Sequence, residues 1–366
     1  MRKGIAMLGG LESMMAPDQK ILVKPNFLLA ADPDKATTTH PSVIKGMLRI
    51  LQEDGYAKVS FGDSPGHGSC EGVVNKIGIK DESNWFGAKR ANMEEEVTVS
   101  YPEGKTCRTF HFSKGIAEAD AIINLCKMKT HALERITGAV KNVYGFICGY
   151  RKAAGHVKYP DATVFARMLA DMHNATNIPL HIMDGVVAME GNGPSSGTPI
   201  AMNVLLFSKD PVAIDTVFSH MIYLDPQVVP TCVEGQAYGV GTCDINNIEV
   251  LMAPAEDAAE QVLTPDQLRE QFGKPNFDVE RKVKKKNALS LITMVIPTAS
   301  KRPYVQKDLC IKCGICVDHC PVEGKAINFK KGKGKPPVYD YKKCIRCYCC
   351  LEMCPRHAIK VKGGLH

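Results

Sequence analysis

Short apolar runs alternate with helical patterns of apolar residues along the first 255 positions of the chain. "KILVKPNFLLA" (20–30) predicts a strand followed by a loop, and "HPSVIKGMLRILQEDG" (40–55) has the spacing of an amphipathic helix. "ADAIINLC" (119–126) predicts a buried strand, and "PDATVFARMLADMHN" (160–174) predicts another helix. Strands that alternate with helices indicate an α/β fold, with a mostly parallel sheet covered by helices on both faces.

This rhythm is lost between residues 256 and 303, where helical spacing gives way to a Pro- and Lys-rich stretch. We therefore predict an α/β domain over 1–255, a linker over 256–303 and a small C-terminal domain over 304–366. The run "RKVKKK" (281–286) contains no interleaved aromatic residues. That composition favours a solvated surface over nucleic-acid binding.

Cysteines are concentrated in the C-terminal domain, since nine of the 15 in the chain follow residue 309. "CIKCGICVDHCP" (310–321) and "CIRCYCCLEMCP" (344–355) both follow the pattern C-x₂-C-x₂-C-x₃-C-P, which is typical of 4Fe-4S cluster binding. Zinc is the alternative, but zinc sites usually combine separate C-x₂-C pairs or mix Cys with His. The spacing therefore favours iron–sulfur clusters.

The repeated motif resembles the bacterial two-cluster ferredoxins over residues 304–366. The resemblance implies a small α+β domain with two 4Fe-4S clusters, in which the fourth cysteine of each run binds the other cluster. Its implied ligands are Cys310, Cys313, Cys316 and Cys354 for one cluster, and Cys344, Cys347, Cys350 and Cys320 for the other. Cys349 is left as a spare thiol, or replaces Cys350 if the loop shifts by one residue.

Positive charge is also concentrated in the tail. The chain carries a net charge of +7, whereas residues 301–366 contain 15 Lys and Arg against 5 Asp and Glu. Two oxidised clusters with eight thiolates contribute about −4, so the tail stays basic. We expect an acidic redox partner such as a ferredoxin or flavodoxin. The alternative is that these lysines hold the C-terminal domain against the acidic remainder of the chain.

The six cysteines outside the tail are scattered, which favours reduced thiols over a disulfide framework and predicts a cytoplasmic protein. The N-terminus has no sustained apolar segment typical of a signal peptide. A run of about 18 apolar residues, as a membrane span requires, is also missing from the sequence. We therefore expect no membrane span.

Several motifs of the α/β domain resemble domain-of-unknown-function family 362, an iron–sulfur-associated family whose members often carry a ferredoxin module. The resemblance spans roughly residues 20–250. It rests on "VKPNF", "GDSPG", "CKMKTH", "TGAVKNVYG", "MDGVVAMEGNGPSSGTP" and "KDPVAIDTV". The chemistry of this family is not established, so the resemblance identifies a site and leaves the reaction open.

Each of these motifs places polar residues after an apolar strand, where open α/β sheets bind ligands. We predict a cleft for a small anionic ligand, with Lys129 and Lys141 binding negative charge and His131 transferring a proton. Asp63 and Glu190 are the candidate catalytic carboxylates. The further ligand-binding candidates are Lys24, Asn26, Ser64, Gly138, Asn142, Gly191 and Gly193.

Structural interpretations compete with some of these roles. The small residues of "TGAVKNVYG" (137–145) suit an anion cradle of backbone N–H groups. "EGNGPSSG" (190–197) either holds a ligand or is a turn packed against the cleft. We expect His67 to be structural, Asp210 to cap a helix, and Cys126 to be packed in the core.

The combined features predict an oxidoreductase in which two clusters relay low-potential electrons to a substrate or cofactor in the α/β cleft. The alternative is a non-catalytic electron carrier or a metallocofactor-handling protein. In its favour, "H…TGAVK" (131–141) resembles the nickel-pincer lactate racemases, which implies a lysine that anchors a cofactor. No motif in the sequence identifies a flavin.

Overall fold

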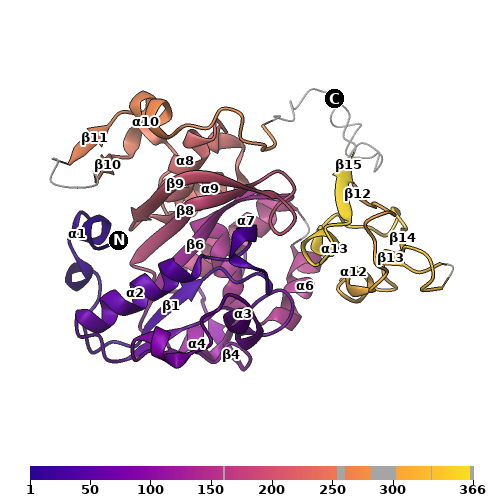
Figure 1. The fold of residues 1–366 in the computed structure, drawn as a ribbon, viewed down its shortest axis with the longest axis horizontal. Helices are drawn as coiled ribbons and strands as arrows, with labels where there is room; N and C mark the ends of the chain where they lie inside the picture. Colours follow the sequence, from indigo (N-terminus) through magenta and orange to yellow (C-terminus); the bar gives the residue numbers. More distant parts are fainter. Residues whose placement is uncertain (160, 254–259, 282–301, 331, 363–366) are drawn as a thin grey trace.

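The central sheet is built from strands that lie far apart in the sequence (Figure 1). In the computed structural model, which describes residues 1–159, 161–253, 260–281, 302–330 and 332–362, the strand order is β3-β2-β1-β6-β8-β9. Neighbours from β3 to β8 pair in parallel, whereas β9 is antiparallel to β8 and β7 is antiparallel to the end of β6. The strands are β1 (Ile21–Pro25), β2 (Val59–Phe61), β3 (Lys89–Arg90), β6 (Ala121–His131), β7 (Arg135–Thr137), β8 (Leu180–Glu190) and β9 (Thr198–Ser208). The predicted, mostly parallel α/β fold is confirmed.

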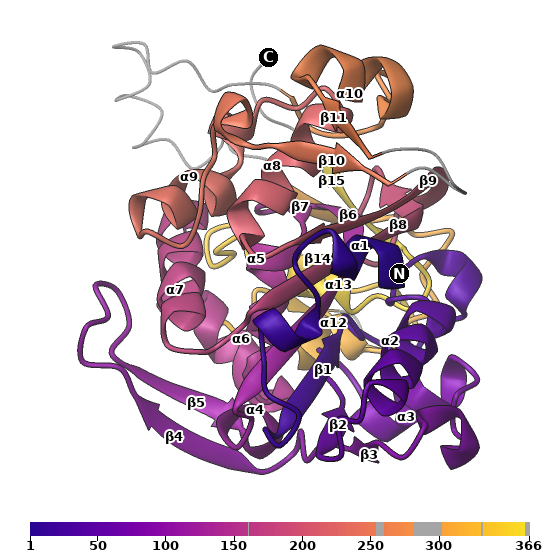
Figure 2. The same ribbon diagram turned by 90° about the vertical axis from the view of Figure 1, so that its left-hand side faces the viewer.

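Helices cover both faces of this sheet. Figure 2 shows α2 and α3 on one side and α7 and α9 on the other. The described helices of this part of the chain are α1 (Arg2–Ala6), α2 (Pro41–Glu53), α3 (Cys70–Lys76), α4 (Lys114–Ala117), α5 (Ala139–Asn142), α6 (Gly149–Lys158), α7 (Ala162–Asn174), α8 (Pro211–Met221), α9 (Pro230–Ala237) and α10 (Pro265–Phe272).

Helix α2 illustrates how the sequence determines this packing. Its N-terminus has Pro41 in the first turn, and the ring of His40 accepts a hydrogen bond from the Ser42 N–H at 3.2 Å. One face of the helix is buried against the sheet through Val43, Ile44, Met47, Leu48 and Leu51. Each such side chain stabilises the fold by roughly 1.5–3 kcal/mol when buried. The helix ends before Gly55, whose φ of 82° suits glycine.

Part of the expected linker packs on the α/β domain. Strand β11 (Gln261–Leu263) pairs with β10 (Val250–Met252), and Thr264 and Gln267 form a capping box at the start of α10. Leu263, Leu268 and Phe277 belong to the main hydrophobic core. Apolar residues spaced within a charged stretch therefore extend the domain beyond residue 255. Residues 254–259 and 282–301, which include most of "RKVKKK", lie outside the described part of the chain.

Residues 302–362 form the C-terminal module, drawn in yellow in Figure 1 beside α6 and one edge of the α/β domain. Two short antiparallel strand pairs flank two helices of one turn each. The elements are β12 (Arg302–Val305), α12 (Ile315–Asp318), β13 (Ile327–Asn328), β14 (Val338–Tyr339), α13 (Cys349–Glu352) and β15 (Ile359–Lys362). A further antiparallel pair, β4 (Glu96–Ser100) with β5 (Thr109–Ser113), projects from the α/β domain (Figure 2). None of the described helices is long and apolar enough to cross a membrane.

Candidate functional site

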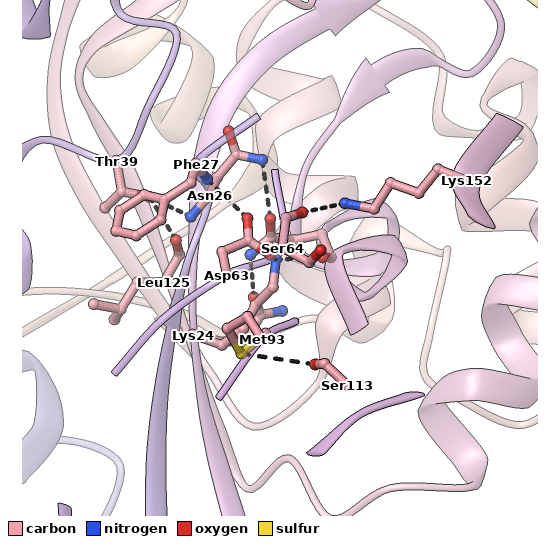
Figure 3. Close-up of polar contacts among 12 residues, drawn as sticks. Lys24, Asn26, Phe27, Thr39, Asp63, Ser64, Met93, Ser113, Leu125 and Lys152 are labelled. Carbon is pink, nitrogen blue, oxygen red and sulfur yellow. Dashed lines mark hydrogen bonds and ion pairs between the residues drawn. The ribbon is translucent and has the colours of Figure 1, made fainter. Parts of the chain in front are cut away.

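A buried polar network forms where β1, β2 and β6 end (Figure 3). The Lys24 Nζ lies 3.0 Å from Asp63 Oδ1 and donates to the Asn142 carbonyl at 2.6 Å. The second Asp63 oxygen accepts the N–H of Phe27 at 2.8 Å. Burial lowers the pKa of Lys24, and the carboxylate of Asp63 opposes that shift. The sequence predicted these residues as a group, and the structure brings them together.

Lys129 is hydrogen-bonded to this network through Asn26. Its Nζ donates to Asn26 Oδ1 and to the Thr37 carbonyl, both at 2.8 Å, and Asn26 in turn donates to Asn142 Oδ1 at 3.0 Å. The side chain is 1% exposed, and burial lowers its pKa well below the ordinary value. Lys129 therefore orients Asn26, and its ammonium is already paired without a ligand. Lys127 is similarly occupied by an ion pair with Asp184 at 2.7 Å.

His131 connects the α/β domain to the C-terminal module. Its Nδ1 accepts the N–H groups of Leu133 (3.2 Å) and Glu134 (3.0 Å), so the ring proton resides on Nε2, 2.9 Å from Glu352 Oε1. Burial lowers the pKa of His131 to about 4. Burial alone would raise the pKa of Glu352, but the hydrogen bond from His131 and the charge of Lys141 lower it to about 2. The pair is a neutral imidazole that donates to a carboxylate.

Three further contacts hold the module in place. Ser195 Oγ donates to the Glu352 carbonyl at 2.8 Å, and Ser196 Oγ lies 2.7 Å from His357 Nδ1. His67 Nδ1 lies 2.9 Å from His319 Nε2. The loop "EGNGPSSG" therefore packs against the module. His67, which we expected to be structural, contacts the module through His319.

A cavity with a volume of about 80 Å³ lies between the α/β domain and the module. It has room for about five water molecules or a small ligand of that size. The α/β domain contributes a polar wall that includes Lys24, Asp63, Ser64, Lys141 and Lys152. The module contributes His319 and, from α13, Cys349, Glu352 and Met353. Three lysines against two carboxylates leave one surplus positive charge on the lining.

Of the three cavity lysines, Lys24 pairs with Asp63 and Lys152 donates to a backbone carbonyl, whereas Lys141 makes neither kind of contact among the described residues. In the part of the chain that the structure describes, the ion pairs include none to Lys141. Its ammonium lies 5.9 Å from the centre of the Tyr144 ring, a weak cation–π contact. The side chain is half-buried at the start of the segment that runs from α5 to α6. Lys141 is therefore the group best placed to bind an anion here.

Sequence reasoning missed two cavity residues on α6, Lys152 and His156. Lys152 donates to the Ser64 carbonyl (Figure 3), and burial lowers its pKa to about 8. His156 stacks on Phe165 at 4.8 Å between ring centres, and its buried Nδ1 has no hydrogen-bond partner among the described residues. Burial lowers the pKa of His156 to about 4. Their i,i+4 spacing in "GYRKAAGHVK" was the available signal, because it places both on one helix face.

Other predicted site residues lie away from the cavity. The anion cradle at Gly138 is filled by the chain itself, since Asp215 accepts the N–H groups of Ala139 (2.6 Å) and Val140 (3.1 Å). A Cβ at Gly138 would lie 2.0 Å from the Asp215 carboxylate, which explains the glycine. Glu190 accepts the Asp278 N–H at 2.8 Å. Gly191 and Gly193 belong to the loop that contacts the module. Asp210 caps α8, as expected.

The cysteines of the C-terminal module fit an iron–sulfur ligand set. Cys310, Cys313, Cys316 and Cys354 line one mostly apolar cavity, which is the set that the crossed ligand pattern implies. Backbone N–H groups of Ala358 and Ala326 donate to Cys354 Sγ (3.2 Å) and Cys320 Sγ (3.3 Å). The Tyr339 hydroxyl lies 3.0 Å from Cys350 Sγ. Hydrogen bonds to sulfur are typical of cluster ligands, whose potentials they tune.

Cys349 faces the cavity between the two parts of the chain. A hydrogen bond between Cys349 and Cys347, together with burial, raises the pKa of Cys349 well above the ordinary value. In the described chain, no three His, Cys, Asp or Glu side chains converge closely enough to hold a single metal ion.

Comparison with known proteins agrees with both parts of this architecture. A family model described as a domain of unknown function (DUF362) matches residues 21–220, and a 4Fe-4S dicluster domain matches residues 302–355. Thylakoid-associated protein sll1697 of Synechocystis sp. is 33% identical over 240 residues, which cover 64% of this chain and 72% of that protein.

Two solved structures share lower similarity. The lactate racemase apoprotein from Thermoanaerobacterium thermosaccharolyticum has a TM-score of 0.36 and 12% identity, over 56% of this chain and 50% of that one. A structural-genomics protein from Thermotoga maritima has a TM-score of 0.33 and 15% identity, over 64% of this chain and 58% of that one. The chain thus spans little more than half of either solved chain. By its sequence and by its match over residues 21–220, the chain belongs to the DUF362 family, with a 4Fe-4S dicluster domain at its C-terminus.

Proposed function

We propose that the protein is an oxidoreductase that reduces a small anionic substrate bound in the cavity between the α/β domain and the C-terminal module. The module holds two 4Fe-4S clusters on the eight cysteines assigned above. When bound, these clusters supply electrons one at a time at low potential. An acidic ferredoxin or flavodoxin is the expected electron donor.

The observation that carries this proposal is the position of α13. Cys349, Glu352 and Met353 on this helix line the cavity, and the helix also contains the cluster ligand Cys350. A ligand in the cavity would therefore lie beside the second cysteine set.

The chain's own groups account for binding and proton supply. Lys141 and Lys152 present positive charge to the ligand, and Lys24 is held in place by Asp63. His156, whose buried Nδ1 has no hydrogen-bond partner among the described residues, is the group best placed to exchange a proton with the ligand. The hydrogen bond from His131 to Glu352 holds α13 against the α/β domain beside the cavity. A two-electron reduction would consume two electrons from the donor and two protons, one of them delivered through His156.

The test is reoxidation of the reduced protein. Anaerobically purified protein would be reduced with titanium(III) citrate, freed of excess reductant and mixed with a panel of small carboxylates and inorganic oxyanions. We expect anions of one chemical class to reoxidise the protein. Reoxidation is measured as the recovery of the visible iron–sulfur absorbance. Lys141→Ala should abolish this response at unchanged iron content, whereas Lys80→Ala, which changes an exposed lysine outside the cavity, should not.

Equal responses of the Lys141→Ala variant and the wild type would contradict the proposed site. The alternative function, a metallocofactor-handling protein, predicts a different result: a transition metal such as nickel bound outside the C-terminal module, with no reoxidation by any small anion. Metal analysis of the same preparation distinguishes the two functions.

A further inference from the structure

Exposed apolar side chains are concentrated in the C-terminal module. Nine large apolar side chains are exposed in the described chain, and three of them belong to this module although it is the much smaller part. They are Leu309 (43% exposed), Ile311 (58%) and Val338 (43%). Exposed apolar groups concentrated on one small domain are typical of an interaction surface.

These exposed residues lie at or next to the cavity of the first cysteine set. Ile311, Lys312 and Arg356 line the same cavity as Cys310, Cys313, Cys316 and Cys354, and Cys313 itself is exposed. Leu309 and Val338 directly adjoin the lining residues Cys310 and Pro337. Every residue that lines this cavity comes from the module, whereas the other cavity, beside α13, is shared with the α/β domain. The first cysteine set is thus lined by the module alone, whereas α13, which carries Cys350 of the second set, faces the α/β domain.

Cationic side chains lie at the centre of this surface and on the segment beside it. Two cationic side chains and no carboxylate line the cavity at its centre. Lys330, Lys333 and Lys335 are exposed on the segment that leads to Pro337 and Val338. An apolar centre with a cationic rim complements an acidic protein surface, and such pairs associate rapidly and dissociate in salt.

We propose that Leu309, Ile311, Lys312, Val338 and Arg356 form the docking face for a small acidic electron-carrier protein. The carrier loses one electron for each electron that the protein accepts. Docking here places the carrier beside the first cysteine set, and the cavity shared with the α/β domain lies beside α13 and the second set. The direction of transfer is therefore from the exposed end of the module to the α/β domain. This inference concerns the partner and is independent of which substrate the cavity binds.

Direct binding tests the proposal. The iron-loaded protein would be immobilised anaerobically and its Kd for a purified bacterial flavodoxin measured by biolayer interferometry from low to high salt. We expect binding that weakens as salt rises, and a Kd raised by about tenfold or more in both Ile311→Asp and Arg356→Glu. Val262→Asp changes an equally exposed valine on β11 (59% exposed) and should leave the Kd unchanged.

Iron content and reduction by titanium(III) citrate serve as controls, because a docking variant should alter neither. If one of the two variants loses iron, the other still tests the docking face. If flavodoxin does not bind the wild type, or binds it and both iron-loaded variants with equal Kd, the docking face is wrong. Neither result bears on the cavity, which is tested by reoxidation with small anions.

Discussion

At the scale of single residues, the lysines of the site divide into those buried away from the cavity and those that line it. Lys127 and Lys129 are fully buried, and their ammonium groups contact Asp184, Asn26 and a backbone carbonyl. Buried charges need such partners, because an unpaired one would cost several kcal/mol. Lys141 and Lys152 instead face the cavity. Lys127 and Lys129 of "CKMKTH" therefore have a structural role at the site. Lys141 and Lys152, from later segments, are the lysines available to contact a ligand.

The pH dependence of ligand binding follows from Lys152. Its pKa is lowered by burial to about 8, so its ammonium is charged below that pH and neutral above it. We predict that affinity for the small anion falls as pH rises through about 8, since each further unit removes about nine-tenths of the remaining charged form. Lys152→Arg should flatten the profile, because arginine stays charged. Titration calorimetry with the anion found in the reoxidation experiment measures both; an unchanged wild-type affinity from pH 7 to 10 would exclude this role.

Neighbouring cysteines should respond differently to substitution. Cys350 lies beside Tyr339 and belongs to the predicted ligand set, whereas Cys349 faces the cavity. We predict that Cys349→Ser retains the full iron and sulfide content of the anaerobic protein and that Cys350→Ser loses about half of it. Elemental analysis with the sulfide assay decides this. The reverse pattern would show that the loop is shifted by one residue, with Cys349 as the ligand.

At the scale of secondary-structure elements, a short segment owes its conformation to a distant carboxylate. Helix α5 has only four residues, and its first N–H groups are satisfied by Asp215 from the middle of α8. Burial raises the pKa of Asp215 to about 7, while the two backbone donors favour its charged form. This arrangement fixes the segment that carries Lys141 and Asn142 toward the cavity.

Removal of that carboxylate should therefore affect stability and the site together. We predict that Asp215→Ala lowers the free energy of unfolding by about 3 kcal/mol, because two buried N–H groups lose a charged acceptor. Asp215→Asn, which keeps one acceptor oxygen, should be less damaging. Urea denaturation followed by circular dichroism measures the difference. A loss below about 0.5 kcal/mol for Asp215→Ala would mean that α5 is held by its packing alone.

The same segment shows where sequence reasoning succeeds and where it does not. The alternation of strands and helices predicted the parallel sheet, and the rule that ligands lie at the carboxyl ends of strands placed Lys24, Asn26 and Asp63 together. The glycine-rich "TGAVK" looked like an anion cradle because small residues allow close approach. A pattern of small residues does not reveal that the anion is Asp215, about 75 positions along the chain.

At the scale of the whole molecule, the proposed function depends on how the two parts of the chain meet. The cysteine spacing predicted the C-terminal module, but no periodicity encodes its orientation. That orientation rests on contacts such as His131 with Glu352 and Ser196 with His357, which join residues more than 150 positions apart. It also closes the cavity over Lys152 and His156 of α6, a helix that was not among those expected from the sequence. Packing between separately predicted units is therefore what the sequence analysis could not supply.

The central claim is that two clusters occupy the module and that one of them adjoins a ligand in the shared cavity. The most direct test is a crystal structure of the anaerobically isolated protein with anomalous diffraction at the iron edge. We predict two four-iron sites, one within Cys310, Cys313, Cys316 and Cys354 and one within Cys344, Cys347, Cys350 and Cys320, with a small anion in contact with Lys141 beside the second. A single iron site, zinc in place of iron, or an anion bound elsewhere with the cavity closed would contradict the account.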